Sequence, residues 1–249
     1  MNYLKKPIYH FIKKFFKAIN LINKVSLQLR KDKLRKIILY RFFIDSFFIF
    51  FRNIVKYQKV NHEFYEYTKK LKLSYDWFGF NAQIWFYIFK KFKLTNKKIE
   101  ILEIGTFEGL STSYFLRYLK KSKLDAVDPL NKKTIFYKNL LLNKEKMRNF
   151  NYFNIKSEKF FKQFKKNYDL IYIDGSHYYK DVLNDANYSF KLLKKNGLII
   201  FDDFLYERES KNKKNKEYTN VIGGIMLFLS KTNNYKIIYA GHQFIIQKL

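Results

Sequence analysis

The chain of 249 residues contains no cysteine. A disulfide framework, a thiolate zinc site and a cysteine nucleophile are therefore excluded. The sequence also lacks a long apolar run, because its most apolar stretch, residues 37–51, is short and carries Arg41 and Asp45. The N-terminus shows no compact apolar core followed by a small-residue cleavage site, so we recognise no secretory signal. These absences predict a cytoplasmic protein that touches a membrane peripherally at most.

Acidic residues are scarce, since 21 Asp and Glu stand against 50 Lys and Arg and give a formal net charge of +29. Such a charge suggests nucleic acid or an anionic membrane as a partner. However, only seven of the basic residues are Arg, and the Lys excess accompanies many Phe, Tyr, Ile and Asn, all encoded by A/T-rich codons. The charge is also spread along the chain, with +14 in residues 1–75 and +15 in the remainder. Charge alone therefore does not predict a nucleic-acid surface.

Residues 1–75 form a basic, aromatic-rich region with helical periodicity and no strand alternation. Lys13, Lys14 and Lys17 lie opposite an apolar face that consists of Ile8, Ile12, Phe15, Phe16 and Ile19. Two interpretations stay open. The region is either a helical appendage packed on the core or on a second subunit, or it is an interfacial helix on a membrane through residues 1–50. A homodimer is compatible with the first interpretation.

Residues 76–249 show a different pattern, in which short apolar runs alternate with helical periods. Strands are predicted at 99–104, 123–128, 151–156, 169–173 and 197–201, with helices at 109–121, 132–147, 157–166 and 178–194. A further helix at 219–230 precedes two short strands around Ala240 and Gly241. Near-continuous apolar strands are typical of parallel sheets that are covered on both faces. We therefore predict an α/β fold with a doubly wound, mostly parallel seven-stranded sheet that is closed by an antiparallel hairpin.

Polar residues follow each of the five parallel strands, at the edge where ligands bind in open α/β sheets. The strand ends carry Glu103 to Gly105, Asp128, Ser157 with Glu158, Asp174 to His177, and Asp202 with Asp203. Each of the five ends includes an Asp or a Glu, which stability alone does not require. The sequence therefore predicts a site along this edge of the sheet.

The turn after the first strand reads Glu103-x-Gly105-x-x-x-Gly109, which is neither a dinucleotide fingerprint nor a P-loop. Its glycines let the backbone approach a ligand closely. Asp128 lies 23 residues beyond Gly105, a distance at which an acid can accept hydrogen bonds from ribose hydroxyls. The turn carries no Lys or Arg for a phosphate. An acidic pocket of this kind favours S-adenosylmethionine (SAM), a ligand with cationic sulfonium and ammonium groups.

The segments "ILEIGTFEGLST", "DAVDP", "YDLIYIDGSH" and "GLIIFDDF", taken together, resemble the class I SAM-dependent methyltransferases. They are most similar to the small-molecule and sugar O-methyltransferase branch, which has IDGSH and DD motifs and includes cephalosporin-hydroxylase-like relatives. The resemblance covers about residues 76–249. It implies methylation of a hydroxyl on a small molecule or a sugar.

The resemblance also implies a role for each matching position. Gly105 and Gly109 would line the methionine part of SAM, and Glu103 would orient the turn. The resemblance further implies that Asp128 holds the ribose. The other implied cofactor contacts are Thr106, Ser111 and Thr112 at the carboxylate of SAM, Ser157 beside the adenine, and Asp174.

In metal-dependent members, acids that match Asp174, Asp202 and Asp203 coordinate a divalent cation, usually Mg²⁺. Clustered carboxylates repel one another unless a cation or a proton bridges them, and all-oxygen ligation suits a hard ion. His177 is the candidate general base, because imidazole titrates near neutrality. The alternatives for His177 are a loop histidine that is hydrogen-bonded to backbone and a residue that supports the site without contacting the substrate. His10, His62 and His242 show no partner pattern and are interpreted as incidental.

Four alternatives to these assignments stay open. The first is a nucleic-acid methyltransferase, which the charge suggests, although "DGSH" stands where (N/D)-P-P-(Y/F) is expected. The second is a non-catalytic SAM-fold protein attached to membranes, and the third is a hydroxylase, for which no iron triad is visible. The last concerns residues 75–89, whose aromatic side chains either pack over the sheet edge or contact the substrate.

The Lys/Asn cluster at 211–216 is interpreted as a surface loop or a lid.

Overall fold

The computed structural model describes residues 5–52, 58–78, 81–130, 132–142, 149–208 and 219–249. Its centre is a seven-stranded sheet with the order β3-β2-β1-β4-β5-β9-β8. The strands are β1 (Glu100–Ile104), β2 (Lys123–Val127), β3 (Phe150–Phe153), β4 (Tyr168–Ile173), β5 (Leu193–Phe201), β8 (Tyr235–Ala240) and β9 (Phe244–Lys248). Strands β1 to β5 pair in parallel, and β9 runs antiparallel to β5 and to β8. The predicted fold class is confirmed.

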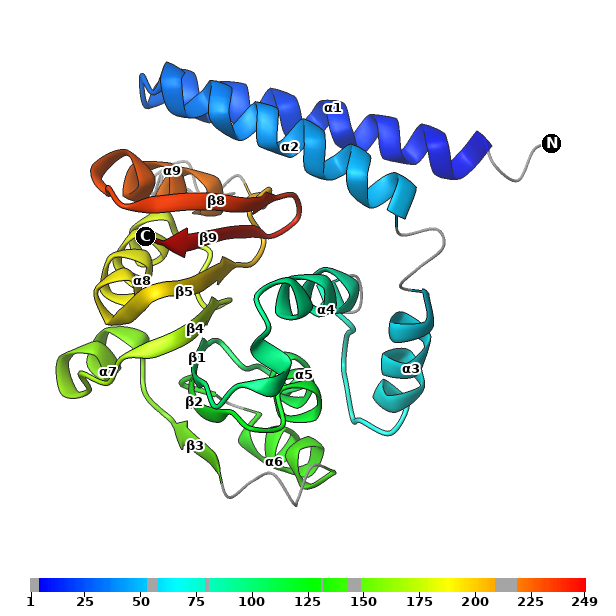
Figure 1. Ribbon diagram of the computed structural model, residues 1–249, viewed down its shortest axis with the longest axis vertical. Coiled ribbons are helices and arrows are strands. Elements are labelled where there is room, and N and C mark those ends of the chain that lie inside the picture. The colour runs from blue at the N-terminus through cyan, green and yellow to red at the C-terminus, as the bar shows by residue number, and fades with distance from the viewer. Residues whose placement is uncertain (1–4, 53–57, 79–80, 131, 143–148, 209–218) are drawn as a thin grey trace.

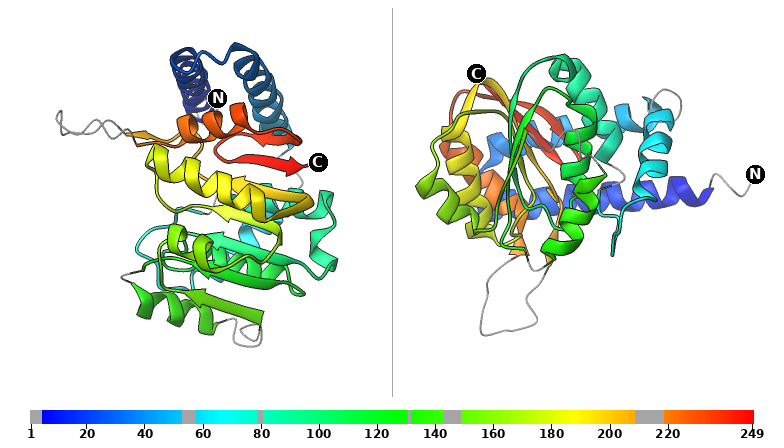
Figure 2. Two further views of the ribbon diagram at one scale, coloured as in Figure 1. Left: turned by 90° about the vertical axis from the view of Figure 1, so that its left-hand side faces the viewer. Right: turned by 90° about the horizontal axis from the view of Figure 1, so that it is seen from below.

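Helices cover both faces of the sheet (Figures 1 and 2). One face packs against α4 (Asn81–Lys91), α5 (Leu110–Tyr118) and α6 (Lys133–Leu141), and the other packs against α7 (Ser157–Gln163), α8 (Tyr179–Leu192) and α9 (Val221–Lys231). Alternate strand residues serve the two faces, since Leu170 and Leu198 join one core cluster while Ile171 and Ile199 join the other. Burial on both sides explains why these strands are apolar throughout. A short 3₁₀ helix (Leu94–Asn96) precedes β1, and β6 (Glu207–Arg208) pairs with β7 (Thr219–Asn220).

The N-terminal region contains α1 (Lys5–Gln28), α2 (Asp32–Arg52) and α3 (Gln58–Thr68). Helices α1 and α2 form a hairpin that lies along α9 and β8, at one end of the sheet (Figure 1). Asp45 is buried in this contact, where it pairs with Arg41 and accepts a hydrogen bond from the backbone N–H of Ala240 at 2.9 Å. This carboxylate therefore ties α2 to the end of β8.

The apolar face predicted for α1 is only partly used in packing. Phe15 and Ile19 pack against the core, whereas 59% of Phe16 is exposed. The division of the chain at residue 75 stays a prediction. None of the helices in the described part of the chain is long and apolar enough to span a bilayer. The proposed surface loop or lid at 211–216 lies outside the described residues.

Candidate active site

The turn between β1 and α5 has an unusual backbone. Gly105, Phe107 and Gly109 all have positive φ angles, of 89°, 44° and 86°. At Gly105 a side chain would also collide with the neighbouring strand end, because an added Cβ would lie 1.9 Å from the carbonyl oxygen of Asp174. The turn can therefore approach the end of β4 only with glycine at this position. Both glycines predicted for the site thus have backbone conformations that favour glycine.

Asp128, just beyond β2, holds this turn in place. Its Oδ2 accepts hydrogen bonds from the backbone N–H groups of Thr106 and Phe107, at 2.7 and 3.0 Å, and from the Thr106 hydroxyl at 3.3 Å. All three bonds end on Oδ2, and Oδ1 takes part in none of them. The structure thus brings Asp128 and Thr106 together at the turn, and their contacts with SAM stay predictions.

Glu103 lies beneath the turn and has no exposed surface. It accepts hydrogen bonds from the hydroxyls of Ser111 and Thr112, which lie in the first turn of α5. Burial raises the pKa of Glu103 to about 8. Glu103 therefore orients the turn by fixing the start of α5. The hydroxyls of Ser111 and Thr112 face this carboxylate, and their contact with a ligand carboxylate stays a prediction.

Ser157 is the first residue of α7, at the carboxyl end of β3. Its side chain lies beside the buried Asp185 of α8, and burial raises the pKa of that acid to about 7. An added Cβ on Gly175 would lie 3.8 Å from Asp185, so Ser157 sits near the loop that follows β4. This position borders the predicted site, and the adenine contact of Ser157 stays a prediction.

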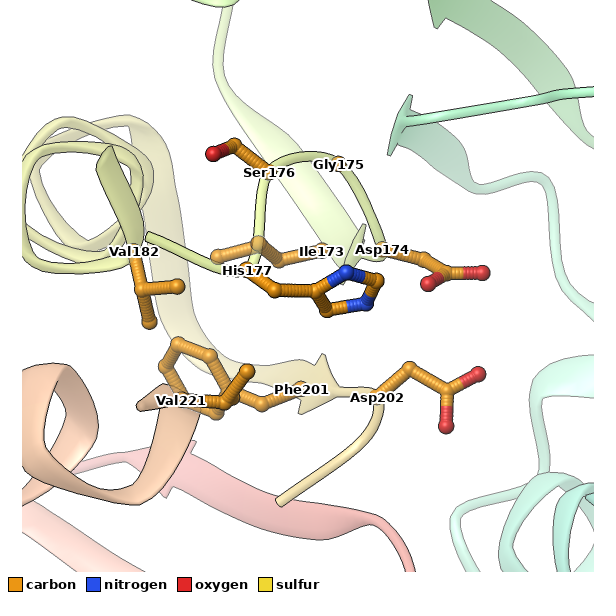
Figure 3. A pocket seen from close by; sticks show the side chains of 9 residues that line it. All are labelled: Ile173, Asp174, Gly175, Ser176, His177, Val182, Phe201, Asp202 and Val221. Carbon is orange, nitrogen blue, oxygen red and sulfur yellow. The ribbon is translucent and has the colours of Figure 1, made fainter. Parts of the chain in front are cut away.

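Three carboxylates meet where β4 and β5 end. Asp174 follows β4, and Asp202 and Asp203 follow β5. The hydroxyl oxygen of the buried Tyr172 lies within hydrogen-bond distance of Asp174, at 2.9 Å, and of Asp202. Burial, followed by the charges of Asp202 and Asp203, raises the pKa of Asp174 well above its usual range. Figure 3 shows the side chains of Asp174 and Asp202 pointing the same way, with the His177 ring between them.

His177 belongs to the same cluster. Its Nε2 lies 2.9 Å from Oδ2 of Asp203, and its ring lies 4.6 Å from that of Tyr206. Burial acts to raise the pKa of Asp203, but the hydrogen bond to His177 and the charges of His177 and His242 outweigh it and lower that pKa. The interpretation of His177 as a residue bonded only to backbone is therefore not favoured.

His242 is the residue whose interpretation as incidental was wrong. It lies between β8 and β9, with Nδ1 3.5 Å from Asp202 Oδ1 and Nε2 3.5 Å from Asp203 Oδ1. The neighbouring Asp202 raises the pKa of His242. Topology explains the position, because the start of an antiparallel β9 lies beside the end of β5. The sequence predicts this hairpin but does not predict that it pairs with the fifth strand.

Asn81, at the start of α4, is a second residue that sequence reasoning missed. Its side chain is 2% exposed, and its Nδ2 donates to Asp202 Oδ2 at 3.4 Å. Its Oδ1 has no hydrogen-bond partner among the residues that the structure describes. The site thus combines three carboxylates, two imidazoles and a buried amide oxygen. Ligand atoms of Asp174, His177 and Asp203, and of Asp202, Asp203 and His242, lie within 4.8 Å of one another, a donor set that fits a divalent cation.

A segment that precedes α4 lies across the turn between β1 and α5. Glu108 of the turn is buried, and it pairs with Lys132 at 2.8 Å while accepting two hydrogen bonds from Ser74. Beside this contact, Trp77 stacks on Phe107, with ring centroids 4.9 Å apart, and 67% of Trp77 is exposed. Trp85 and Phe78, in contrast, are buried in the core. The aromatic residues of 75–89 therefore have two different environments. Phe78 and Trp85 pack in the core, whereas Trp77 lies at the surface beside the turn.

Comparisons with known proteins converge on this region. A family model described as a methyltransferase domain matches residues 102–204. Uncharacterized protein R132 of Acanthamoeba polyphaga mimivirus is 30% identical over 152 residues, which cover 55% of this chain and 67% of that protein.

Two solved structures share the fold. An O-methyltransferase from Bacillus cereus in complex with SAH is 16% identical, with a TM-score of 0.55 and coverage of 85% of this chain and 99% of that one. TomG from Streptomyces achromogenes, an O-methyltransferase involved in tomaymycin synthesis and solved with SAM, is 13% identical, with a TM-score of 0.52 and coverage of 84% and 97%.

Proposed function

Since this chain belongs to the SAM-dependent methyltransferases, we propose that it methylates a hydroxyl on a small molecule or a sugar with the help of a divalent cation. The observation that carries the proposal is the cluster of Asp174, Asp202, Asp203 and His177 at the strand ends beside the SAM turn. The Bacillus cereus and Streptomyces achromogenes proteins, which share the fold, are O-methyltransferases, and this supports the same choice.

The chain's own residues divide the work of binding. Asp128 fixes the turn through Oδ2 and keeps Oδ1 for the ribose hydroxyls, and the positive φ of Gly105 and Gly109 brings the backbone close to the methionine part. The carboxylates make the pocket acidic, which suits a cationic ligand. SAM, when bound, supplies an electrophilic methyl group on a sulfonium that is already a good leaving group. Positioning therefore contributes most of the rate.

Proton transfer is assigned to His177. With Nε2 held 2.9 Å from Asp203, the other ring nitrogen, Nδ1, can take the proton of the acceptor hydroxyl, and Asp203 stabilises the resulting imidazolium. Asp174, Asp202 and Asp203 would hold the cation, for which the donor set fits. A cation there lowers the pKa of the acceptor hydroxyl and orients it. Trp77 stands exposed beside the turn, where it can contact an acceptor ring.

Metal removal tests this proposal directly. Methyl transfer from SAM is screened against sugar and phenol libraries with the protein as purified, after dialysis against a chelator, and after divalent cation is added back. Dialysis is expected to lower turnover about 100-fold or more, because a metal contributes several kcal/mol to such steps, while SAM affinity by calorimetry changes little. Full turnover in chelator would refute the cation, and transfer into RNA or DNA but into no small hydroxyl would favour the nucleic-acid alternative.

We also propose that the α1–α2 hairpin contacts the anionic cytoplasmic surface of a membrane. Ten Lys and Arg stand against two Asp between residues 13 and 46. Large apolar side chains are exposed among them: Phe16, Leu27, Ile37, Tyr40, Phe43 and Ile44. Basic residues interleaved with exposed apolar ones suit a surface that carries anionic lipid, and the cytoplasmic leaflet is such a surface.

Vesicle flotation checks this contact. The full chain is expected to float with phosphatidylserine vesicles at low salt, and to float much less with phosphatidylcholine vesicles or at high salt. Replacing Tyr40 and Phe43 by serine should abolish flotation. The matched control replaces Leu141 and Leu142, which are exposed apolar residues at the end of α6, and should float like the parent. Equal flotation of all three proteins would contradict the assignment to α2.

A further inference from the structure

The cation site that the proposed function uses has a histidine on each side of Asp203. His177 lies against Oδ2 of this carboxylate and His242 lies against Oδ1. We infer that His242 is a nitrogen ligand of the cation, and that the site therefore selects a first-row transition ion such as Mn²⁺ over Mg²⁺. This inference rests on the proposed cation, but it assigns a residue and a metal class that the carboxylates alone do not specify.

Donor chemistry supports the choice of metal. Mg²⁺ prefers oxygen ligands and keeps several waters, whereas imidazole suits transition ions. An oxygen-only set of Asp174, Asp202 and Asp203 would suit Mg²⁺. One imidazole in place of a water shifts the preference toward the transition ions, among which Mn²⁺ binds most weakly and therefore gives the most demanding comparison with Mg²⁺.

The geometry suits a shared ion better than it suits a simple ion pair. Each nitrogen of His242 lies 3.5 Å from a different carboxylate, longer than the usual 2.7–3.2 Å of an N–H···O hydrogen bond. Two ligands at adjacent octahedral positions, each about 2.1 Å from the ion, lie roughly 3 Å apart. If one nitrogen binds the ion, the other faces a carboxylate, the partner that metal-bound histidines commonly use.

The backbone around His242 is held firmly, although its side chain is 60% exposed. Its carbonyl accepts a hydrogen bond from the N–H of Phe204, the residue after Asp203, at 2.9 Å. The next residue, Gln243, is fully buried and accepts a hydrogen bond from Trp85 at 2.8 Å. At Gly241 an added Cβ would lie 2.1 Å from the Tyr239 hydroxyl oxygen. The β8–β9 hairpin thus fixes the position of the His242 side chain, which contributes little to the core.

Metal binding by the full chain tests the inference without any turnover assay. Protein stripped by chelator is titrated with Mn²⁺ and followed by electron paramagnetic resonance, with Mg²⁺ as the competitor. Mn²⁺ is expected to bind about 100-fold more tightly than Mg²⁺. His242→Ala should lose roughly 10- to 100-fold in Mn²⁺ affinity, a range typical of losses at metal sites, with little change for Mg²⁺. His62→Ala, which alters an exposed histidine on α3, is the control and should match the parent.

A spectroscopic measurement identifies the ligand. The ¹⁴N coupling of an imidazole to bound Mn²⁺ is expected in the parent and in His62→Ala, and it should be lost in His242→Ala. Coupling that survives in His242→Ala, or equal affinities for Mn²⁺ and Mg²⁺, would overturn the inference and leave the proposed function standing. Binding of neither ion would overturn the inference together with the proposed cation, and SAM calorimetry would show whether the methyltransferase assignment itself is intact.

Discussion

Asp128→Ala is expected to lower the affinity of the protein for SAM by at least about 100-fold, since two charge-assisted hydrogen bonds are worth roughly 3 kcal/mol or more. The variant removes two functions at once. The turn loses the acceptor for the N–H groups of Thr106 and Phe107. The ribose hydroxyls lose the oxygen that we assign to them. Isothermal titration calorimetry of the purified variant gives the measurement.

The control for this variant is Asp169→Ala. Asp169 also accepts a backbone hydrogen bond, from the N–H of Glu100 at 2.8 Å, but it lies at the opposite edge of the sheet, where β1 and β4 begin. Asp169→Ala removes one negative charge, as Asp128→Ala does, so the two variants have the same net charge. We expect its SAM affinity to stay within about threefold of the parent, less than the 1 kcal/mol typical of a single altered site. Equal affinities of the two variants would show that Asp128 does not hold the ribose.

The sheet was predictable because burial on both faces makes its strands readable as apolar runs. The run in β4 spans Tyr168–Ile173, within one residue of the predicted strand. Boundaries were less accurate where polar residues extend a strand. β5 begins at Leu193, four residues before the predicted start, and includes Lys194 and Lys195, which carry no apolar signal. The apolar pattern of the sequence thus predicts the buried part of a strand. It does not predict the polar residues by which the strand extends toward solvent.

The part of the candidate site that lies at the ends of the parallel strands was predictable from the sequence. Their carboxyl ends share one edge, so Asp128, Asp174 and Asp202 were expected to lie together, and the structure brings Asp174 and Asp202 onto one tyrosine hydroxyl. His242 and Asn81 reach the same place from an antiparallel hairpin and from a helix before the first strand. No periodicity in the sequence connects segments that are so far apart, and only the assembled topology does so.

The N-terminal region shows the same limit. Helical periodicity predicts that residues 1–75 are helical, as α1, α2 and α3 are. It does not predict where they dock. The contact of Asp45 with Ala240 joins residues 195 positions apart, and burial raises the pKa of this carboxyl against the effect of Arg41. In the sequence analysis, Asp45 served only as evidence against a membrane span. Its role in docking α2 could not be predicted from the sequence.

Gly105→Ala should have the largest effect on stability of any single substitution proposed here. The new Cβ would lie 1.9 Å from the Asp174 carbonyl oxygen and 2.8 Å from the backbone nitrogen of Gly175, and the φ of 89° is strained for alanine. The colliding atoms belong to the backbone at the end of β4, so no side chain can move aside. We expect a loss of about 4 kcal/mol or more, in the range of severe steric changes, and a melting temperature roughly 10 °C lower.

Gly175→Ala is the matched control, because it adds the same methyl group in the loop that Gly105 approaches. The atom nearest to its Cβ would be Ile104 Cγ2 at 3.3 Å, Asp185 Oδ2 would lie in ordinary contact at 3.8 Å, and its φ lies outside the left-handed region. A loss below about 1 kcal/mol is expected there, since a side-chain methyl can shift by a few tenths of an ångström. Scanning calorimetry of both variants decides the matter. Equal melting temperatures would mean that the turn can retreat from β4, and the close packing that brings the SAM turn to Asp174 would then not be required for the fold.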